Sequence, residues 1–185
     1  MEPRRGPART DGQPPDAGFT ANLVTAFADR LAELMEDAAA ETAGRRGEAT
    51  AAIIALRHEP GMSIRRLADV LGIAQPTCVT MTERLRDTGL VDRRPGPDAR
   101  TAALFLTAEG GRSARKLLRT RHRIAERTLS ALDPETRTTV HAALVSMLES
   151  MTTDRAAADH ICRRCDEFSC PDELCPVERA LRPEP

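Results

Sequence analysis

The chain has no Trp and no Tyr, and only four Phe among its 185 residues. A core with so few large rings must be built from Leu, Val, Ile, Met and Ala, which suit closely packed helices better than sheets. The sequence also lacks any run of about 18 apolar residues, and its N-terminus is charged, so we expect neither a membrane span nor a secretion signal. Catalytic-triad order, phosphate-binding loops and zinc-hydrolase motifs are missing as well. These absences predict a cytoplasmic protein that is not an enzyme.

The net charge of the chain is only -1, but the positive and negative residues are distributed unevenly along it. Residues 57–127 hold 15 Arg and Lys against 8 Asp and Glu, whereas the remaining residues hold 12 against 20. A basic centre between acidic helical ends is expected when one lobe faces phosphates and the other faces a partner subunit.

Residues 63–106 form the stretch around which the rest of the chain is organised. Ser63 suits the N-cap of a short helix with apolar positions three and four apart, and Gly72 suits its end. Pro76 suits the first turn of a second helix, which Gly89 ends. Two amphipathic helices joined by so short a turn are typical of a helix-turn-helix, whose second helix enters the major groove of DNA.

The second helix of this pair has an apolar side and a polar side. Cys78, Met81 and Leu85 form the apolar stripe, where Cys78 is expected to be structural rather than a redox sensor. The remaining surface is assigned to Gln75, Thr77, Val79, Thr80, Thr82, Glu83 and Arg84.

A β-hairpin wing is predicted directly behind the second helix. One strand begins at Leu90, the segment 93–100 is a basic turn, and residues 101–106 return as the second strand. An Arg-rich turn is often only a solvated loop, but its position behind a helix-turn-helix favours contact with phosphates or the minor groove. The predicted DNA-binding residues are Gln75, Thr77, Val79, Thr80, Arg84, Arg93, Arg94, Asp98 and Arg100, with Asp98 orienting an arginine at the wing tip.

These residues resemble the MarR family of winged-helix transcription regulators. The resemblance rests on Q-P-T at the start of the second helix, E-R-L followed by G-L-V, the D-x-R of the wing and a closing L-T-x-x-G, and it extends over about residues 21–151. It implies a homodimer that binds double-stranded DNA and associates through its first and last helices. One departure is Val79-Thr80, where many members have Ser-Arg, and it favours contact with a thymine methyl over a guanine.

The expected fold is mainly α with a small β-hairpin wing, a winged helix-turn-helix joined to a helical dimerisation region. Outside the reading part, residues 48–106, helices with apolar faces are predicted over 19–43, 108–128 and 134–151, and these faces imply a partner subunit. The chain then divides into a disordered arm (1–18), a winged-helix and dimerisation domain (19–152) and a cysteine-rich, metal-binding tail (153–185).

Four of the five cysteines lie in that tail with the spacing C-x2-C-x4-C-x4-C: Cys162, Cys165, Cys170 and Cys175. Zinc held by four thiolates is the first interpretation, and an iron–sulfur cluster is the second, because both centres take four closely spaced cysteines. Unliganded thiols or disulfides are the third. Pro171 and Pro176 are expected to keep the chain extended, Arg163 and Arg164 to offset the anionic centre, and His160 to be a solvated residue at a helix end.

The sequence therefore predicts a homodimeric repressor of a palindromic operator. Release from DNA would follow binding of a small-molecule effector or a metal or redox change at the cysteine cluster. The alternative is a thiol- or metal-handling module whose winged helix serves protein contact. Binding at a membrane is not expected.

Overall fold

The computed structural model describes residues 16–96, 102–171 and 173–182. The described chain is mainly helical with one small antiparallel sheet, which confirms the predicted fold class. Its elements are α1 (Ala17–Ala43), α2 (Glu48–His58), β1 (Met62–Ser63), α3 (Ile64–Leu71), α4 (Gln75–Asp87), β2 (Val91–Pro95), β3 (Ala102–Leu106), α5 (Ala108–Leu129), α6 (Pro134–Met151), α7 (Arg155–Cys162), a 3-10 turn (Glu167–Ser169) and α8 (Pro176–Ala180).

Local capping chemistry explains where several helices begin. Ser63, Thr107 and Asp133 each accept hydrogen bonds from backbone N–H groups in the first turns of α3, α5 and α6, as expected of N-cap side chains. Gly72 ends α3 with a φ of 67°, a left-handed conformation that favours glycine. The sequence therefore specifies these helix boundaries through local hydrogen bonds.

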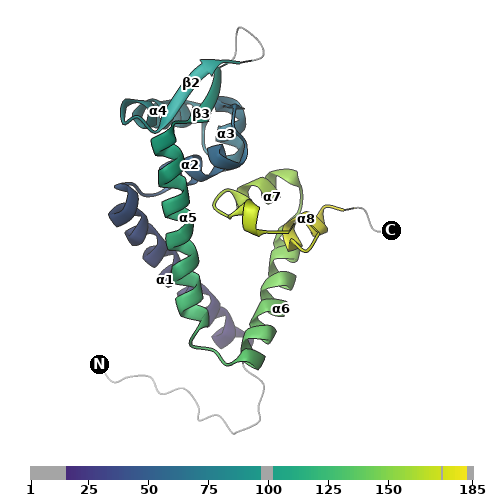
Figure 1. Ribbon diagram of the computed structural model, residues 1–185. Helices are drawn as coiled ribbons and strands as arrows, with labels where there is room; N and C mark the ends of the chain where they lie inside the picture. The colour runs from purple at the N-terminus through teal and green to yellow at the C-terminus, as the bar shows by residue number, and fades with distance from the viewer. Residues whose placement is uncertain (1–15, 97–101, 172, 183–185) are drawn as a thin grey trace, which may run out of the picture. The chain divides into compact units, whose positions relative to one another are not determined.

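The helix-turn-helix of α3 and α4 packs beside a sheet with the strand order β1-β3-β2 (Figure 1). The wing hairpin pairs Val91 with Leu106 and Pro95 with Ala102. β1 was not predicted; it pairs with β3 at Met62 and Leu104, which ties the chain before α3 to the base of the wing.

One apolar cluster holds this reading head, a name we use for residues 48–107. Fully buried side chains from α2, α3, α4, β3 and α5 meet in the cluster, and α5 therefore serves as the support on which the reading head is built. Its largest buried members are Ile53, Ile54, Leu56, Leu67, Leu71, Leu85, Leu104 and Leu117.

The chain divides into two compact units after Leu34, inside α1. The first unit carries an exposed apolar face on α1, where the side chains of Phe19, Leu23 and Phe27 are all about half exposed. In the second unit, α6 has no buried residue, and Leu144, Met147 and Met151 are exposed on it. Helix α1 begins at Ala17, so the predicted disordered arm is wrong for its last two residues, and residues 1–15 lie outside the described part.

The end of the chain folds into a compact piece that we call the cysteine module, residues 153–182 with the gap at 172. Asp154 caps α7 by accepting a hydrogen bond from the N–H of Ala157. The predicted extension after Pro176 is wrong, because Pro176 occupies the first turn of α8, where its missing N–H costs nothing. None of the described helices is long and apolar enough to span a membrane.

Candidate nucleic-acid interface and cysteine module

Helix α4 presents one exposed side and one buried side. Gln75, Thr77, Val79, Thr80 and Arg84 are all exposed, in agreement with the surface predicted for them. Cys78 and Leu85 are fully buried on the opposite side and fix the rotation of the helix. The exposed side offers amide, hydroxyl, methyl and guanidinium groups, which are the groups that proteins use to contact base edges and phosphates.

Thr82 corrects the predicted outer surface of α4. Its side chain is 1% exposed, and its hydroxyl donates to the carbonyl oxygens of Cys78 and Val79, each at 2.9 Å. Thr82 lies four residues after Cys78 and three before Leu85, so the helical period places it on the buried side. A hydroxyl is tolerated at a buried position when it donates its hydrogen bond to a carbonyl oxygen of its own helix.

Glu83 is half buried and links α4 to the wing. Its carboxylate forms ion pairs with Arg86 on the same helix and with Arg93 of β2, the latter at 3.5 Å. Arg94 lies 4.6 Å above the ring of Phe105 and 3.6 Å from the carboxylate of Asp92. The ion pair with Glu83 holds Arg93 beside α4, whereas Asp92 and Phe105 hold Arg94 on the wing.

Two predicted wing residues, Asp98 and Arg100, lie outside the described residues. The described part of the predicted DNA-binding set therefore consists of Gln75, Thr77, Val79, Thr80, Arg84, Arg93 and Arg94, and all seven are exposed on α4 and β2.

Cys78 has the environment of a structural thiol. It is fully buried, and burial raises the pKa of the thiol to about 11. A protonated, inaccessible thiol is a poor nucleophile. Cys78 therefore belongs to the core of the reading head.

The first two cysteines of the module form one tight pair. The N–H of Cys165 donates to the carbonyl oxygen of Cys162 at 2.8 Å, which closes a turn and brings the two side chains together. A hydrogen bond from the Cys162 thiol, helped by the positive charges of Arg121 and Arg163, lowers the pKa of Cys165 to about 7. The same hydrogen bond, together with burial, raises the pKa of Cys162.

The other two cysteines face the same region from the far end of the module. Cys175 is 8% exposed and packs with Ala158 and Val177 in a small apolar cluster, which Cys162 and Cys170 flank. All four cysteines line one cavity of about 760 Å³. As they stand, no three Cys, His, Asp or Glu side chains among the described residues are arranged to hold a metal ion.

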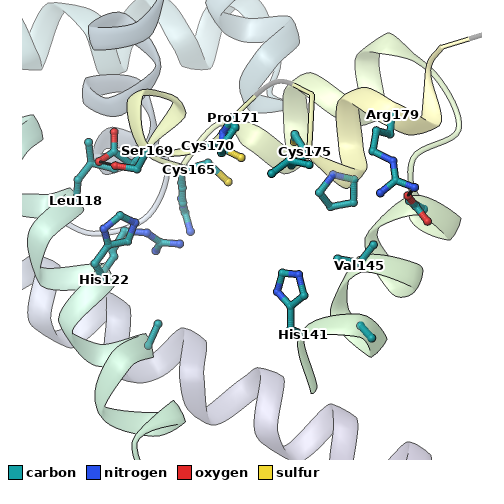
Figure 2. Close-up of a pocket in the computed structure, with 18 of the residues that line it drawn as sticks. Leu118, His122, His141, Val145, Cys165, Ser169, Cys170, Pro171, Cys175 and Arg179 are labelled. Carbon is teal, nitrogen blue, oxygen red and sulfur yellow. Dashed lines mark hydrogen bonds and ion pairs between the residues drawn. The ribbon is translucent and has the colours of Figure 1, made fainter. Parts of the chain in front are cut away.

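A second cavity, of about 910 Å³, lies between α5, α6 and the cysteine module. Figure 2 shows His122 on α5 and His141 on α6 on its two sides, with Cys165 and Cys170 at the module. Burial and the charge of Arg164 lower the pKa of Arg121, which also lines this cavity. The cavity thus combines apolar walls with cationic and imidazole groups.

Polar contacts join the cysteine module to the reading head, and none of them was predicted. Asp159 of α7 forms an ion pair with Arg66 of α3. His160 Nδ1 lies 3.2 Å from the carbonyl oxygen of Val70, so this nitrogen is the one that donates. His58 Nε2 lies 2.9 Å from the carbonyl oxygen of Cys165.

His160 and the arginine pair therefore differ from prediction. His160 is packed rather than solvated, and Arg164 pairs with Glu48 and Glu36 at 3.3 and 3.1 Å. Arg163 pairs with Glu48 at 3.6 Å while still acting on Cys165, and the unpredicted Arg121 adds a second positive charge there. No sequence signal marks the contacts of His160 and Arg164, because they join residues that are between 90 and 128 positions apart.

Residues 44–101 match the model of the MarR family. No curated protein sequence matches the chain.

Solved structures with the same fold cover the chain more widely. RV1404 of Mycobacterium tuberculosis has a TM-score of 0.66 and 20% identity, over 77% of this chain and 97% of that one. MepR, a transcription regulator of the Staphylococcus aureus multidrug efflux pump MepA, has a TM-score of 0.63 and 19% identity, over 70% and 96%. FabT of Streptococcus pneumoniae, solved in complex with DNA, has a TM-score of 0.64 and 16% identity, over 71% and 94%. The chain thus has the winged-helix fold of these proteins.

Proposed function

We propose that the protein is a MarR-type transcription regulator that binds a palindromic DNA operator as a homodimer and represses transcription from it. The observation that carries the proposal is the division of α4: five polar or small side chains are exposed on one side, while Cys78, Thr82 and Leu85 anchor the other side in the core. In a winged helix the side of this helix that faces away from the core enters the major groove.

The wing supports the same proposal. Arg93 lies beside α4 and Arg94 lies against Phe105 of the wing, and both carry guanidinium groups that suit phosphates or the narrow minor groove. Two other proteins with this fold support the proposal: FabT was solved in complex with DNA, and MepR is a transcription regulator.

Homodimerisation is proposed from two apolar faces that a single chain leaves exposed. α1 exposes Phe19, Leu23 and Phe27, and α6 exposes Leu144 and Met151. Full burial of such a side chain is worth roughly 1.5 to 3 kcal/mol, and about half of this remains to be gained at these half-exposed positions, so a second copy that covers both helices is favoured. Two reading heads related by a two-fold axis would select a palindrome whose half-sites lie about one helical turn apart.

Release from DNA is proposed to follow a change in the spacing of the two heads. The cavity beside His122 and His141 suits a small-molecule effector with apolar and acidic parts, because Arg121 lines it. The cysteine module is proposed as a second, metal- or redox-responsive input. Both inputs would act in the cytoplasm, beside the DNA.

Selection from a pool of random duplexes tests the DNA-binding proposal. The full chain is expected to enrich one palindrome and to bind it more tightly than a scrambled duplex of the same length. Light scattering of the same sample is expected to give the mass of a dimer, and Leu144→Glu is expected to shift it to a monomer. Enrichment of no sequence would contradict the function, and a stable monomer at micromolar concentration would contradict the dimer and the palindrome.

A further inference from the structure

The cysteine module is too small to be held by its own apolar core. Among its described residues, Ala158, Cys175 and Val177 are the buried members of the cluster, with Leu148 of α6 packed against them. Chain segments of fewer than about 40 residues usually need disulfides, a metal or an oligomer to stay folded. None of the five cysteines forms a disulfide in the structure, so no such bond ties the module.

Four thiols line one cavity of the module and are the groups available to tie it together. The N–H of Cys165 donates to the carbonyl oxygen of Cys162, and Cys162 and Cys170 pack against the apolar cluster in which Cys175 is buried. The four side chains come from α7, the turn after it, the end of the 3-10 turn and the N-cap of α8. One ion held by all of them would join every part of the module.

The chemistry of this set fits a thiophilic metal. Four thiolates are the ligands of many structural zinc sites and of iron–sulfur clusters. Metals that prefer oxygen ligands, such as Mg²⁺, bind thiolates poorly. Binding would release the thiol protons to solvent. The cationic groups of Arg121 and Arg163 near Cys165 would offset the negative charge of the centre.

We propose that Cys162, Cys165, Cys170 and Cys175 form a tetrathiolate metal centre, and that the module folded around it clamps the turn between α3 and α4. This inference deepens the metal-responsive input of the proposed function and rests on it only for its link to DNA binding.

The contacts that would form the clamp lie where α7 meets the end of α3. His160 packs against Gly72, the left-handed residue that ends α3: a β-carbon there would lie 3.0 Å from His160 Cε1. The same imidazole contacts the carbonyl oxygen of Val70, and the neighbouring Asp159 pairs with Arg66. Only Ile73 and Ala74 separate Gly72 from α4, so the module touches the turn that orients the reading helix.

Loss of the metal would therefore loosen this turn without unfolding the reading head. The module would lose its tie, and His160 and Asp159 would leave α3. The core formed by α2, α3, α4 and α5 would stay folded, because its many buried side chains do not depend on the module. The two heads of a dimer would then lose their fixed orientation.

Metal analysis of the full chain, purified without air or chelator, tests the centre. About one zinc per chain identifies a zinc site, whereas iron with acid-labile sulfide and visible absorption identifies a cluster. Cys165→Ser is expected to lower the bound metal at least tenfold, and Cys78→Ser, which alters a core thiol, is expected to retain it. Wild-type protein with neither zinc nor iron would overturn the proposal.

Hydrogen exchange tests the clamp and needs no DNA. Chelation is expected to speed exchange at least tenfold over residues 70–75 and over α7, while α2 and α5 keep their protection. His160→Ala is expected to speed exchange at 70–75 with the metal still bound, and His122→Ala on α5 is the matched control. Unchanged exchange at 70–75 after chelation would overturn the clamp. Failure to bind any DNA would contradict the proposed function alone.

Discussion

The reading head and the cysteine module are held together by different forces. The reading head buries large aliphatic side chains from α2, α3, α4 and β3 against α5, so its order follows from apolar packing. The module buries Ala158, Cys175 and Val177, and it meets the reading head through ion pairs and imidazole contacts. Apolar packing needs no added component, whereas the proposed metal centre would make the order of the module depend on a bound metal. The comparison therefore predicts that the module can come apart while the reading head stays folded.

The largest effect is expected from a cavity in the reading head. Leu85 is fully buried on α4, and Leu85→Ala should lower the free energy of unfolding by about 2 to 5 kcal/mol. Chemical denaturation followed by circular dichroism measures this change. Leu174 is 70% exposed, and Leu174→Ala should stay within about 0.5 kcal/mol of wild type. Equal effects of the two changes would contradict the assignment of the core.

A cavity in the module should act locally. Val177 is buried at the start of α8, and Val177→Ala should cost the module about 2 kcal/mol while the midpoint of the main transition stays the same. Hydrogen exchange resolves the two regions: protection should fall in α7 and remain in α2. A shift of both regions together would mean that they unfold as one unit.

The interface between the two regions should respond to charge. Glu48 pairs with Arg163 and Arg164, and all three side chains are mostly buried. Glu48→Gln should therefore destabilise the attachment by about 1 to 3 kcal/mol, because two guanidinium groups lose a partner. The matched control is Glu33→Gln, which breaks an exposed pair with Arg30 and should change stability by less than about 1 kcal/mol. Limited proteolysis after residue 153 reports detachment, and equal cleavage of both variants would contradict a charge-held interface.

The smallest effect is expected at Cys78. Cys78→Val nearly conserves volume and should change the free energy of unfolding by less than about 1.5 kcal/mol at pH 7. Burial raises the thiol pKa from 9.0 to about 11, so the folded state favours the neutral thiol. Its contribution to stability is complete below pH 9 and is lost as the pH rises towards 11. The wild-type minus Cys78→Val difference in unfolding free energy should fall over this window, and a flat difference would show that the thiol is not buried.

Helix boundaries in and beside the reading head could be predicted from the sequence because local hydrogen bonds determine them. Ser63 caps the helix that it was predicted to cap, and Gly72 ends α3 as predicted; Thr107 and Asp133 cap α5 and α6 in the same way. Those boundaries depend on residues within four positions of one another. The exposed side of α4 also followed from helical periodicity, except at Thr82, where a polar residue type masked a buried position.

The rest depends on contacts that sequence patterns do not carry. His160 and Arg66 become informative only when α7 lies on α3, about 90 residues earlier in the chain. The predicted extension after Pro176 is wrong because a proline also suits the first turn of a helix. The residues that follow Pro176 decide between an extended chain and a helix, and here they form α8. β1 has two residues, too few for any periodic pattern, and exists because β3 pairs with it. The four-cysteine metal set stays a prediction, and the surface that the module contacts could not be predicted from the sequence.

The most direct test of the account is a titration of the selected palindrome with wild type, Arg84→Ala and Arg127→Ala. Arg84 is exposed on the reading side of α4, whereas Arg127 is exposed near the end of α5 and serves as a charge-matched control. Fluorescence anisotropy with selected and scrambled duplexes, at fixed salt, gives the specific part of the binding free energy. The account predicts that Arg84→Ala removes about 1 to 3 kcal/mol of the preference for the palindrome, while Arg127→Ala keeps that preference. Equal loss of binding to both duplexes in the two variants, or no loss with Arg84→Ala, would contradict a reading role for α4.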